Sequence, residues 1–267
     1  KAINHAKYSP GLVYYKKVPK IKEIKNKEEI KNAIEVGEEE FKKLNVAVVG
    51  DVMLDQFIWG EVSRISPEAP VPIVEVRGES FVPGGAANVA NNIRSLRGKV
   101  SLFGVVGNDA VGDKLLELAN NAGIDCDGVL KDGRRPTTLK TRIIAHSQQV
   151  VRVDREKRDD IDDHLVQKLL EKIKKISHKL DALIVSDYGK GAITHRLWSE
   201  LVELGKQNNV FLAVDPKDTH FMNYKRASVI TPNHHEAGFV YGKRIRDENT
   251  LKEVGWGLLK RLKAEAL

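Results

Sequence analysis

The stretch PGGAANVANN, residues 83–92, is the part of the sequence that decides the fold. Its two adjacent glycines, Gly84 and Gly85, let the backbone approach a ligand closely. The small residues that follow favour the start of a helix, and a loop leading into a helix N-terminus presents N–H groups that suit polyhydroxylated or anionic ligands. A Gly-Gly pair before a helix is also common in an ordinary tight turn. The prediction of a ligand site therefore needs support from elsewhere in the chain.

The composition is that of a globular protein with a sizeable core. The chain has 267 residues, of which 41% are hydrophobic and 30% charged, a balance typical of folded rather than disordered or fibrous chains. No run approaches the roughly 18–20 apolar residues that cross a bilayer, and no signal peptide pattern is present, so we expect a cytoplasmic protein. The single cysteine, Cys126, excludes an internal disulfide, and its neighbours predict a packing role at a strand edge.

The net charge of +7 does not indicate a nucleic-acid-binding protein. Lysine and arginine are interleaved with acidic residues almost everywhere, which is typical of solvated helix faces. Aromatic residues make up 6% of the chain and are spread along it, so no stacking surface for bases is predicted. The modest positive excess fits a small anionic ligand.

Residues 1–45 differ from the remainder of the chain. Residues 1–19 have two prolines and no periodicity, whereas residues 21–44 approximate helical spacing that Gly37 interrupts. We therefore expect an N-terminal arm with helices over residues 1–45, followed by one α/β domain over residues 46–267.

Five short apolar runs in the second part end in polar residues and alternate with helical segments. Such alternation predicts a mainly parallel sheet with helices on both faces. The polar ends lie at residues 51, 107, 187, 215 and 233. They would line one edge of the sheet, where open α/β sheets bind their ligands. Asp51 and Asp55 are placed at or just past such a strand end, although an aspartate there is also a common helix cap.

Two segments predict a smaller β structure outside the main sheet. Residues 57–82 contain three prolines in six residues, which forbid a helix, and residues 138–153 alternate polar and apolar side chains. We expect these segments to cover a site or to pair with a second chain. Arg142, Arg152 and Arg155 lie along this structure, either as solvated strand residues or as a basic rim for a phosphate.

Six stretches together resemble the ribokinase-like (PfkB) carbohydrate kinases. They are AVVGDVMLD (47–55), SRISPEAPVPIVEV (63–76), PGGAANVANNIRSL (83–96), SDYGKGAIT (186–194), DPK (215–217) and TPNHHE (231–236). The matches run through about residues 46–240. The second and third stretches are similar to the branch that phosphorylates heptose 7-phosphate.

This resemblance implies a fold, a reaction and an assembly. The fold would be ribokinase-like α/β, with the β lid formed by about residues 57–82 and 138–153. The reaction would be ATP-dependent and Mg²⁺-dependent phosphorylation of O1 of D-glycero-D-manno-heptose 7-phosphate to the 1,7-bisphosphate, for ADP-heptose and lipopolysaccharide core synthesis. The expected assembly is a homodimer through the lid, with no nucleic-acid or membrane partner.

The resemblance also implies roles for individual residues. Those expected around the sugar ring are Asp51, Asp55, Gly84, Gly85, Asn88 and Asp187. Those expected at the 7-phosphate are Arg142, Arg152 and Lys190, a glycine-flanked lysine just beyond a strand end. Those expected at ATP are Asp215, Lys217, Asn233 and Glu236, with Glu236 also holding Mg²⁺ through water. These parts suit phosphoryl transfer, which needs alignment and charge neutralisation.

One departure concerns the catalytic base. The family's Gly-Ala-Gly-Asp segment, whose aspartate is the base, does not occur here, and a predicted helix over about residues 248–267 closes the sequence. The expectation is that the base lies beyond Leu267, that the 267 residues are a fragment or the ordered part of a longer protein, and that alone they do not phosphorylate at a useful rate. Two alternatives stay open: another PfkB-type sugar or sugar-phosphate kinase, and a catalytically incomplete protein that binds sugar phosphates.

Overall fold

The computed structural model describes residue 39 and residues 41–267. The arm predicted for residues 1–19 and nearly all of the helical segment predicted for residues 21–44 lie outside the described residues.

The main sheet, called sheet A, has six parallel strands in the order β10-β9-β8-β1-β4-β5. Its strands are β1 (Asn45–Gly50), β4 (Lys99–Gly107), β5 (Asp125–Asp132), β8 (Ala182–Ser186), β9 (Phe211–Asp215) and β10 (Val229–Ile230). From β1 the chain builds outward to β4 and β5 on one side, and later to β8, β9 and β10 on the other. The strand order therefore reverses at β1, which is where such sheets form a crevice at their carboxyl ends.

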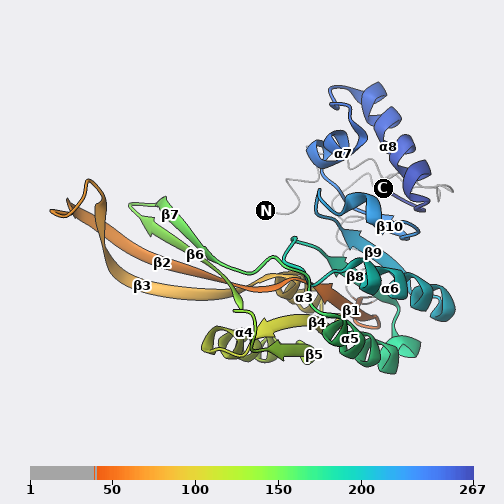
Figure 1. Cartoon of the computed structure of the whole chain (residues 1–267), viewed down its shortest axis with the longest axis horizontal. Helices are drawn as coiled ribbons and strands as arrows, with labels where there is room; N and C mark the ends of the chain where they lie inside the picture. The colour runs from red at the N-terminus through yellow and green to blue at the C-terminus, as the bar shows by residue number, and fades with distance from the viewer. Residues whose placement is uncertain (1–38, 40) are drawn as a thin grey trace.

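Helices cover both faces of sheet A, as predicted (Figure 1). They are α3 (Ala86–Ser95), α4 (Ala110–Asn121), α5 (Asp163–Ile176), α6 (His195–Asn208), α7 (His234–Tyr241) and α8 (Glu248–Leu262), with short 3₁₀ turns at Ser177–Lys179 and Phe221–Asn223. Alternate residues of β1 point to opposite faces: Val46 and Val48 join α3 and α4, whereas Ala47 and Val49 join α5 and α6. The near-continuous burial of β1 follows from this two-sided cover.

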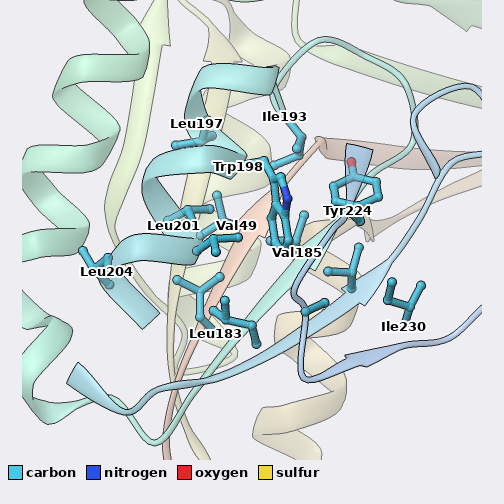
Figure 2. Close-up of a cluster of buried hydrophobic side chains, with 14 of the residues drawn as sticks. Val49, Leu183, Val185, Ile193, Leu197, Trp198, Leu201, Leu204, Tyr224 and Ile230 are labelled. Atoms are coloured by element: carbon cyan, nitrogen blue, oxygen red, sulfur yellow. The ribbon is translucent and has the colours of Figure 1, made fainter. Parts of the chain in front are cut away.

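The larger core lies on the α5 and α6 face of sheet A. Figure 2 shows Leu197, Trp198 and Leu201 of α6 packed over Val49 and the neighbouring strand residues. Trp198 meets Tyr224 edge to face, with 5.2 Å between the ring centroids. Tyr224 is almost fully buried, so its hydroxyl needs an internal hydrogen-bond partner.

The second sheet, called sheet B, has four strands in the order β3-β2-β6-β7. They are β2 (Val52–Ile65), β3 (Pro72–Gly85), β6 (Thr138–Ala145) and β7 (Gln148–Arg155). Sheet B extends from sheet A as a long twisted ribbon (Figure 1). Because β2 begins two residues after β1 ends, sheet B starts at the carboxyl edge of sheet A.

Several predicted boundaries need correction. The Gly84–Gly85 pair does not form a loop but ends β3, and α3 begins directly at Ala86. Asp55 lies within β2, because β2 and β3 continue pairing up to the Val52–Gly85 register partners. The antiparallel pair therefore extends beyond the predicted segment 57–82 at both ends, from Val52 to Gly85.

Two further elements differ from expectation. Strand β5 was not predicted as part of the sheet, because its sequence DCDGVLKD shows little apolar alternation. The helix predicted for residues 248–267 ends at Leu262. Lys263 adopts a left-handed conformation there, and Ala266 then forms a parallel bridge with Val229 beside β10.

Among the described residues, no helix is long and apolar enough to span a membrane.

Candidate active site

Asp51 is a buried carboxylate directly after β1. Its Oδ2 accepts hydrogen bonds from the backbone N–H groups of Tyr188 (2.7 Å) and Lys190 (3.0 Å), and its Oδ1 accepts one from Ala192 (3.0 Å). Burial raises the pKa of Asp51 above its ordinary value, although these three N–H groups act in the opposite direction. Asp51 therefore organises the segment that follows β8, in addition to any contact with a sugar.

The two glycines of the deciding stretch lie against the two aspartates. A Cβ added at Gly84 would lie 2.5 Å from Oδ2 of Asp55, and one added at Gly85 would lie 2.3 Å from the backbone oxygen of Asp51. The N–H of Ala86 donates to that same oxygen of Asp51 at 3.0 Å. The glycines are thus required for the close approach of β3 to both carboxylate-bearing positions.

Asp55 carries an ion pair with Arg142 of the neighbouring strand β6. Nη1 of Arg142 lies 2.5 Å from Oδ1 of Asp55, and both side chains are mostly buried. The guanidinium also sits over the ring of Phe57, 5.3 Å from its centroid. The predicted sugar residue and the predicted phosphate residue are therefore brought together.

Lys190 contacts a carboxylate that sequence reasoning missed, Glu156. Its Nζ lies 2.9 Å from Oε1 of Glu156, which also accepts from Nε of Arg158 at 2.8 Å. Nζ of Lys140 reaches Oε2 of the same carboxylate at 3.3 Å. Burial by itself would raise the pKa of Glu156, but the hydrogen bonds from Lys190 and Arg158 lower it to about 2.

The low pKa of Glu156 predicts a loss of stability in acid. A carboxyl whose folded pKa is about 2, against an ordinary 4.5, stabilises the fold above pH 4.5 and loses that contribution as the pH falls toward 2. We expect Glu156→Gln to lower the unfolding free energy by about 1–3 kcal/mol at pH 7. Urea unfolding of both proteins from pH 7 to pH 2 should show this difference shrinking; a difference independent of pH would contradict the prediction.

Arg152 is the third predicted phosphate residue, and it is also paired. Its Nε lies 2.9 Å from Oδ1 of Asp154 on the same strand, and Lys140 reaches Oδ2 of Asp154 at 3.2 Å. Arg142, Arg152 and Lys190 therefore each have a carboxylate partner within the protein.

Asp187, at the end of β8, has both carboxylate oxygens occupied. Oδ1 accepts from the N–H of Gly189 at 2.8 Å, and Oδ2 accepts from the hydroxyl of Tyr224 at 2.6 Å and lies 2.9 Å from Nδ1 of His220. Burial, with the nearby charge of Asp187, raises the pKa of Tyr224 above its ordinary value. Tyr224 and His220 were missed because nothing in their local sequence indicates a contact with a residue more than 30 positions earlier.

Asp215 lies at the end of β9, next to Asp187, whose N–H donates to the Asp215 backbone oxygen at 3.1 Å. Its pKa is raised, first by burial and then by the charges of Glu236 and Asp187. Lys217 lies beside the segment after β8, since a Cβ added at Gly189 would be 3.5 Å from its Cγ. Two strand ends and the first turn of α7 thus bring acidic groups near one another beside a lysine.

Asn233 and Glu236 form a capping box at the start of α7. The Asn233 side chain accepts from the N–H groups of His235 and Glu236, and Oε2 of Glu236 accepts from the N–H of Asn233 at 2.8 Å. The four-residue spacing is thus explained locally by helix capping. Within the part of the chain that the structure describes, no three His, Cys, Asp or Glu side chains are grouped to hold a metal.

Asp109 and Arg135 tie the turn before β6 to the site. The side chain of Asp109 accepts from the N–H and the hydroxyl of Thr137, whose oxygen accepts from the N–H of Gly107. Nη2 of Arg135 donates to the backbone oxygen of Lys190 at 2.6 Å. These contacts connect the end of β4 at Gly107 to the segment after β8. Neither Asp109 nor Arg135 was predicted for the site.

The predicted positions therefore fall into two groups. Those gathered where sheets A and B meet are Asp51, Asp55, Gly84, Gly85, Arg142, Asp187 and Lys190. The other positions lie outside this junction: Asp215 ends β9 and Lys217 follows it, and Asn233 and Glu236 begin α7 after β10. Asn88 is exposed in the first turn of α3, and Arg152 is exposed on β7.

A cavity of about 690 Å³ opens elsewhere, lined in part by Gly205, Phe211 and Arg226. Phe211 is the first residue of β9 and Asp215 its last, so this cavity lies at the amino end of the strand. Because open α/β sheets bind ligands at the carboxyl ends of their strands, we assign the site to the opposite edge.

Solved structures share this architecture. The tetrameric inhibited form of phosphofructokinase-2 from Escherichia coli superposes with a TM-score of 0.65 at 16% identity, over 83% of this chain and 71% of that chain. A carbohydrate kinase from Agrobacterium tumefaciens superposes with a TM-score of 0.59 at 20% identity, over 79% of this chain and 67% of that chain. A parallel sheet with polar strand ends and a second sheet rising from the same edge defines a ribokinase-like α/β protein.

The chain belongs to the PfkB family of carbohydrate kinases, because the family model described as "pfkB family carbohydrate kinase" matches residues 43–266. The resemblance found in the sequence is thereby confirmed at the level of the family. Cys126 is partly buried and packs against the core formed with α3 and α4, as predicted. Burial raises the pKa of its thiol to about 11, which disfavours a thiolate nucleophile.

Curated relatives carry the name "Bifunctional protein HldE". Those of Desulfatibacillum aliphaticivorans and Geobacter sulfurreducens are 42% and 41% identical to this chain, over 85% and 84% of it. That of Helicobacter pylori strain J99 is 46% identical over 72% of the chain. The chain spans about half the length of the curated relatives it matches, since it covers 46%, 46% and 41% of them.

Proposed function

We propose that this chain forms the sugar-phosphate-binding part of a kinase that transfers a phosphoryl group from ATP to O1 of D-glycero-D-manno-heptose 7-phosphate. The product would be the 1,7-bisphosphate, a precursor in ADP-heptose and lipopolysaccharide core synthesis. The observation that carries this proposal is the meeting of carboxylate oxygens and cations where sheets A and B join. The choice of a heptose rests on the similarity of residues 63–76 and 83–96 to the heptose 7-phosphate kinase branch.

The sugar side of the proposed site consists of Asp51, Asp55 and the glycine stretch. A sugar with several hydroxyl groups needs fixed acceptors, and a site that hydrogen-bonds a hydroxyl discriminates strongly against an analogue that lacks it. Asp55 and Asp51 are held by backbone and side-chain contacts, and Gly84 and Gly85 allow β3 to pack directly against them. Preorganised acceptors of this kind orient O1 for an in-line displacement.

The phosphate side consists of Arg142 and Lys190, with Arg152 farther out on β7. A phosphate monoester carries about −1.5 to −2 charges at pH 7, so it binds best where several donors converge. Arg142 forms an ion pair with Asp55. Lys190 belongs to the segment whose backbone N–H groups bind the Asp51 carboxylate. This adjacency supports one ligand that presents both hydroxyls and a phosphate.

The nucleotide side consists of Asp215, Lys217, Asn233 and Glu236. The capping box uses Oε2 of Glu236, so Oε1 is the oxygen that would contact Mg²⁺ through water. When bound, Mg²⁺ would neutralise phosphate charge during transfer. Lys217 would serve the same purpose from the end of β9.

Sheet B supports the proposed lid and dimer contact. Trp59, Ile65 and Val76 lie on its two longest strands with 47%, 60% and 61% of their surfaces exposed. Exposed apolar side chains on an extended sheet favour a partner, and a second copy of this chain is the proposed one. Residues 46–267 are proposed as the kinase domain, and its ATP dependence implies a cytoplasmic location.

Ligand titration of the purified protein tests the proposed substrate. We expect heptose 7-phosphate to bind at least about tenfold more tightly than fructose 6-phosphate, because the correct sugar satisfies the fixed acceptors. In a protein that contains the base segment, ADP release from ATP in the presence of Mg²⁺ should likewise be faster with heptose 7-phosphate than with fructose 6-phosphate. Equal affinity for both sugars, or a preference for fructose 6-phosphate, would favour another PfkB-type kinase.

A further inference from the structure

Glu156 lies at the centre of a dense charge cluster beside the proposed substrate site. Its side chain is only 8% exposed, and those of Lys140 and Lys190 are 13% and 14% exposed. Both lysines direct Nζ at the Glu156 carboxylate, and Arg158 adds a third donor. Three cations converging on one carboxylate reproduce the donor arrangement that a phosphate group requires.

The two lysines come from different parts of the fold. Lys140 belongs to β6 of sheet B, where its partner in the ladder with β2 is Asp55. Lys190 belongs to the segment after β8 of sheet A, and its backbone N–H is bound to Asp51. The backbone of each lysine therefore lies next to one of the proposed sugar-binding aspartates.

The cluster holds more positive than negative charge. Around Glu156 and Asp154, the described contacts gather the four cations Lys140, Arg152, Arg158 and Lys190. With two carboxylates against four cations, an excess of two positive charges remains. A phosphate monoester, with a charge near −2, would balance that excess.

Glu156 lies outside the strands, so a change in its position would break no strand ladder. It follows Arg155, the last residue of β7, and lies in a segment without regular secondary structure. Arg158, 73% exposed, lies two residues further along the same segment and can move with it. The lysines, in contrast, are anchored on a strand and on the Asp51-bound segment.

We propose that Glu156 takes the place of the substrate's phosphate in the ligand-free protein, and that a bound sugar phosphate displaces it from Lys140 and Lys190. This inference rests on the proposed function, which it deepens by adding Lys140 as a phosphate ligand and Glu156 as an internal anion that competes with the substrate's phosphate. An unphosphorylated sugar brings no anion to replace Glu156, so the pair of lysines stays occupied. Glu156 thereby competes with the phosphate of a ligand and leaves the binding of the hydroxyl groups unaffected.

Removing the charge of Glu156 tests the proposal. We expect Glu156→Gln to bind heptose 7-phosphate about tenfold more tightly than the unchanged protein, because the competing carboxylate is gone. Affinity for the unphosphorylated heptose should stay within about twofold. Calorimetric titration measures both, and unchanged or weaker binding of heptose 7-phosphate by Glu156→Gln would overturn the proposal.

A matched control and a second probe separate this result from other causes. Glu200→Gln changes the net charge equally, at a half-exposed pair with Lys174 on the far helices α5 and α6, and should leave binding unchanged. Inorganic phosphate, titrated by ³¹P NMR, should also bind Glu156→Gln more tightly. If heptose 7-phosphate does not bind the unchanged protein, the proposed function fails, whereas the inorganic phosphate ratio still decides the role of Glu156.

Lys140→Met provides an independent variant if Glu156→Gln does not fold. As a phosphate ligand, Lys140 should be worth about tenfold in affinity for heptose 7-phosphate and for inorganic phosphate. If the cluster served only to join sheets A and B, Lys140→Met would lower stability and leave phosphate affinity unchanged. That second outcome would refute the proposal.

Discussion

Gly85→Ala should destabilise the protein by about 3 kcal/mol or more and should abolish sugar-phosphate binding. Gly85 has φ 54° and ψ −132°, a conformation that side-chain-bearing residues rarely adopt. An added Cβ would lie 2.3 Å from the backbone oxygen of Asp51 and 2.7 Å from Cε of Met53. Relief of that clash must move the end of β3 away from Asp51, which also breaks the hydrogen bond from Ala86 to Asp51. Urea unfolding and titration with heptose 7-phosphate measure the two effects.

Gly78→Ala is the matched control for this prediction. Gly78 lies in the same strand, and a Cβ added there would meet no atom within 4 Å. We expect its unfolding free energy to stay within about 0.5 kcal/mol of the unchanged protein. If Gly85→Ala and Gly78→Ala were equally stable, the close approach of β3 to Asp51 would not be a requirement of the fold.

Asp51→Asn should lower the unfolding free energy by about 2–4 kcal/mol and remove heptose 7-phosphate binding. Asp51 accepts three backbone N–H groups with two oxygens, and it is only 3% exposed. An asparagine replaces one acceptor oxygen with an N–H₂ donor that would face a backbone donor. The segment that carries Lys190 would then lose its anchor, so phosphate binding should fall along with stability.

Asp163→Asn supplies the comparison for the loss of a carboxylate at an exposed position. Asp163 pairs with Arg196 at 2.8 Å, yet its side chain is 83% exposed. Exposed pairs contribute little because solvent screens them, so a change within about 0.5 kcal/mol is expected. Similar losses for Asp51→Asn and Asp163→Asn in unfolding experiments would show that burial of the Asp51 contacts is unimportant.

The sequence predicted the main sheet well because each central strand carries its own local signal. Apolar runs such as residues 46–49 are buried on both faces, and polar residues follow them directly. The boundaries of β2 and β3 were harder, because pairing between them extends both strands into residues that locally resemble loops. Strand β5, at the edge of sheet A, has a polar sequence that only its pairing with β4 makes regular.

The residues of the candidate site also differ in whether a local sequence signal marks them. Asp51, Asp55 and the glycine stretch were found because strand ends and glycine pairs are visible over a few residues. Glu156 and Tyr224 were not, since their partners Lys190 and Asp187 lie 34 and 37 positions away along the chain. Contacts at such separations have no local pattern that a sequence can display.

The sequence by itself determined five strands of sheet A and the helices between them, the place of the polar strand ends, and the family. Tertiary structure decided which charges meet: Arg142 pairs with Asp55 across 87 positions, and Glu156 joins lysines from two sheets. The physical reason is that backbone propensity and hydrophobic periodicity act over a few residues. The pairing of charges, in contrast, depends on the register of strands and on burial that exists only once both sheets are assembled.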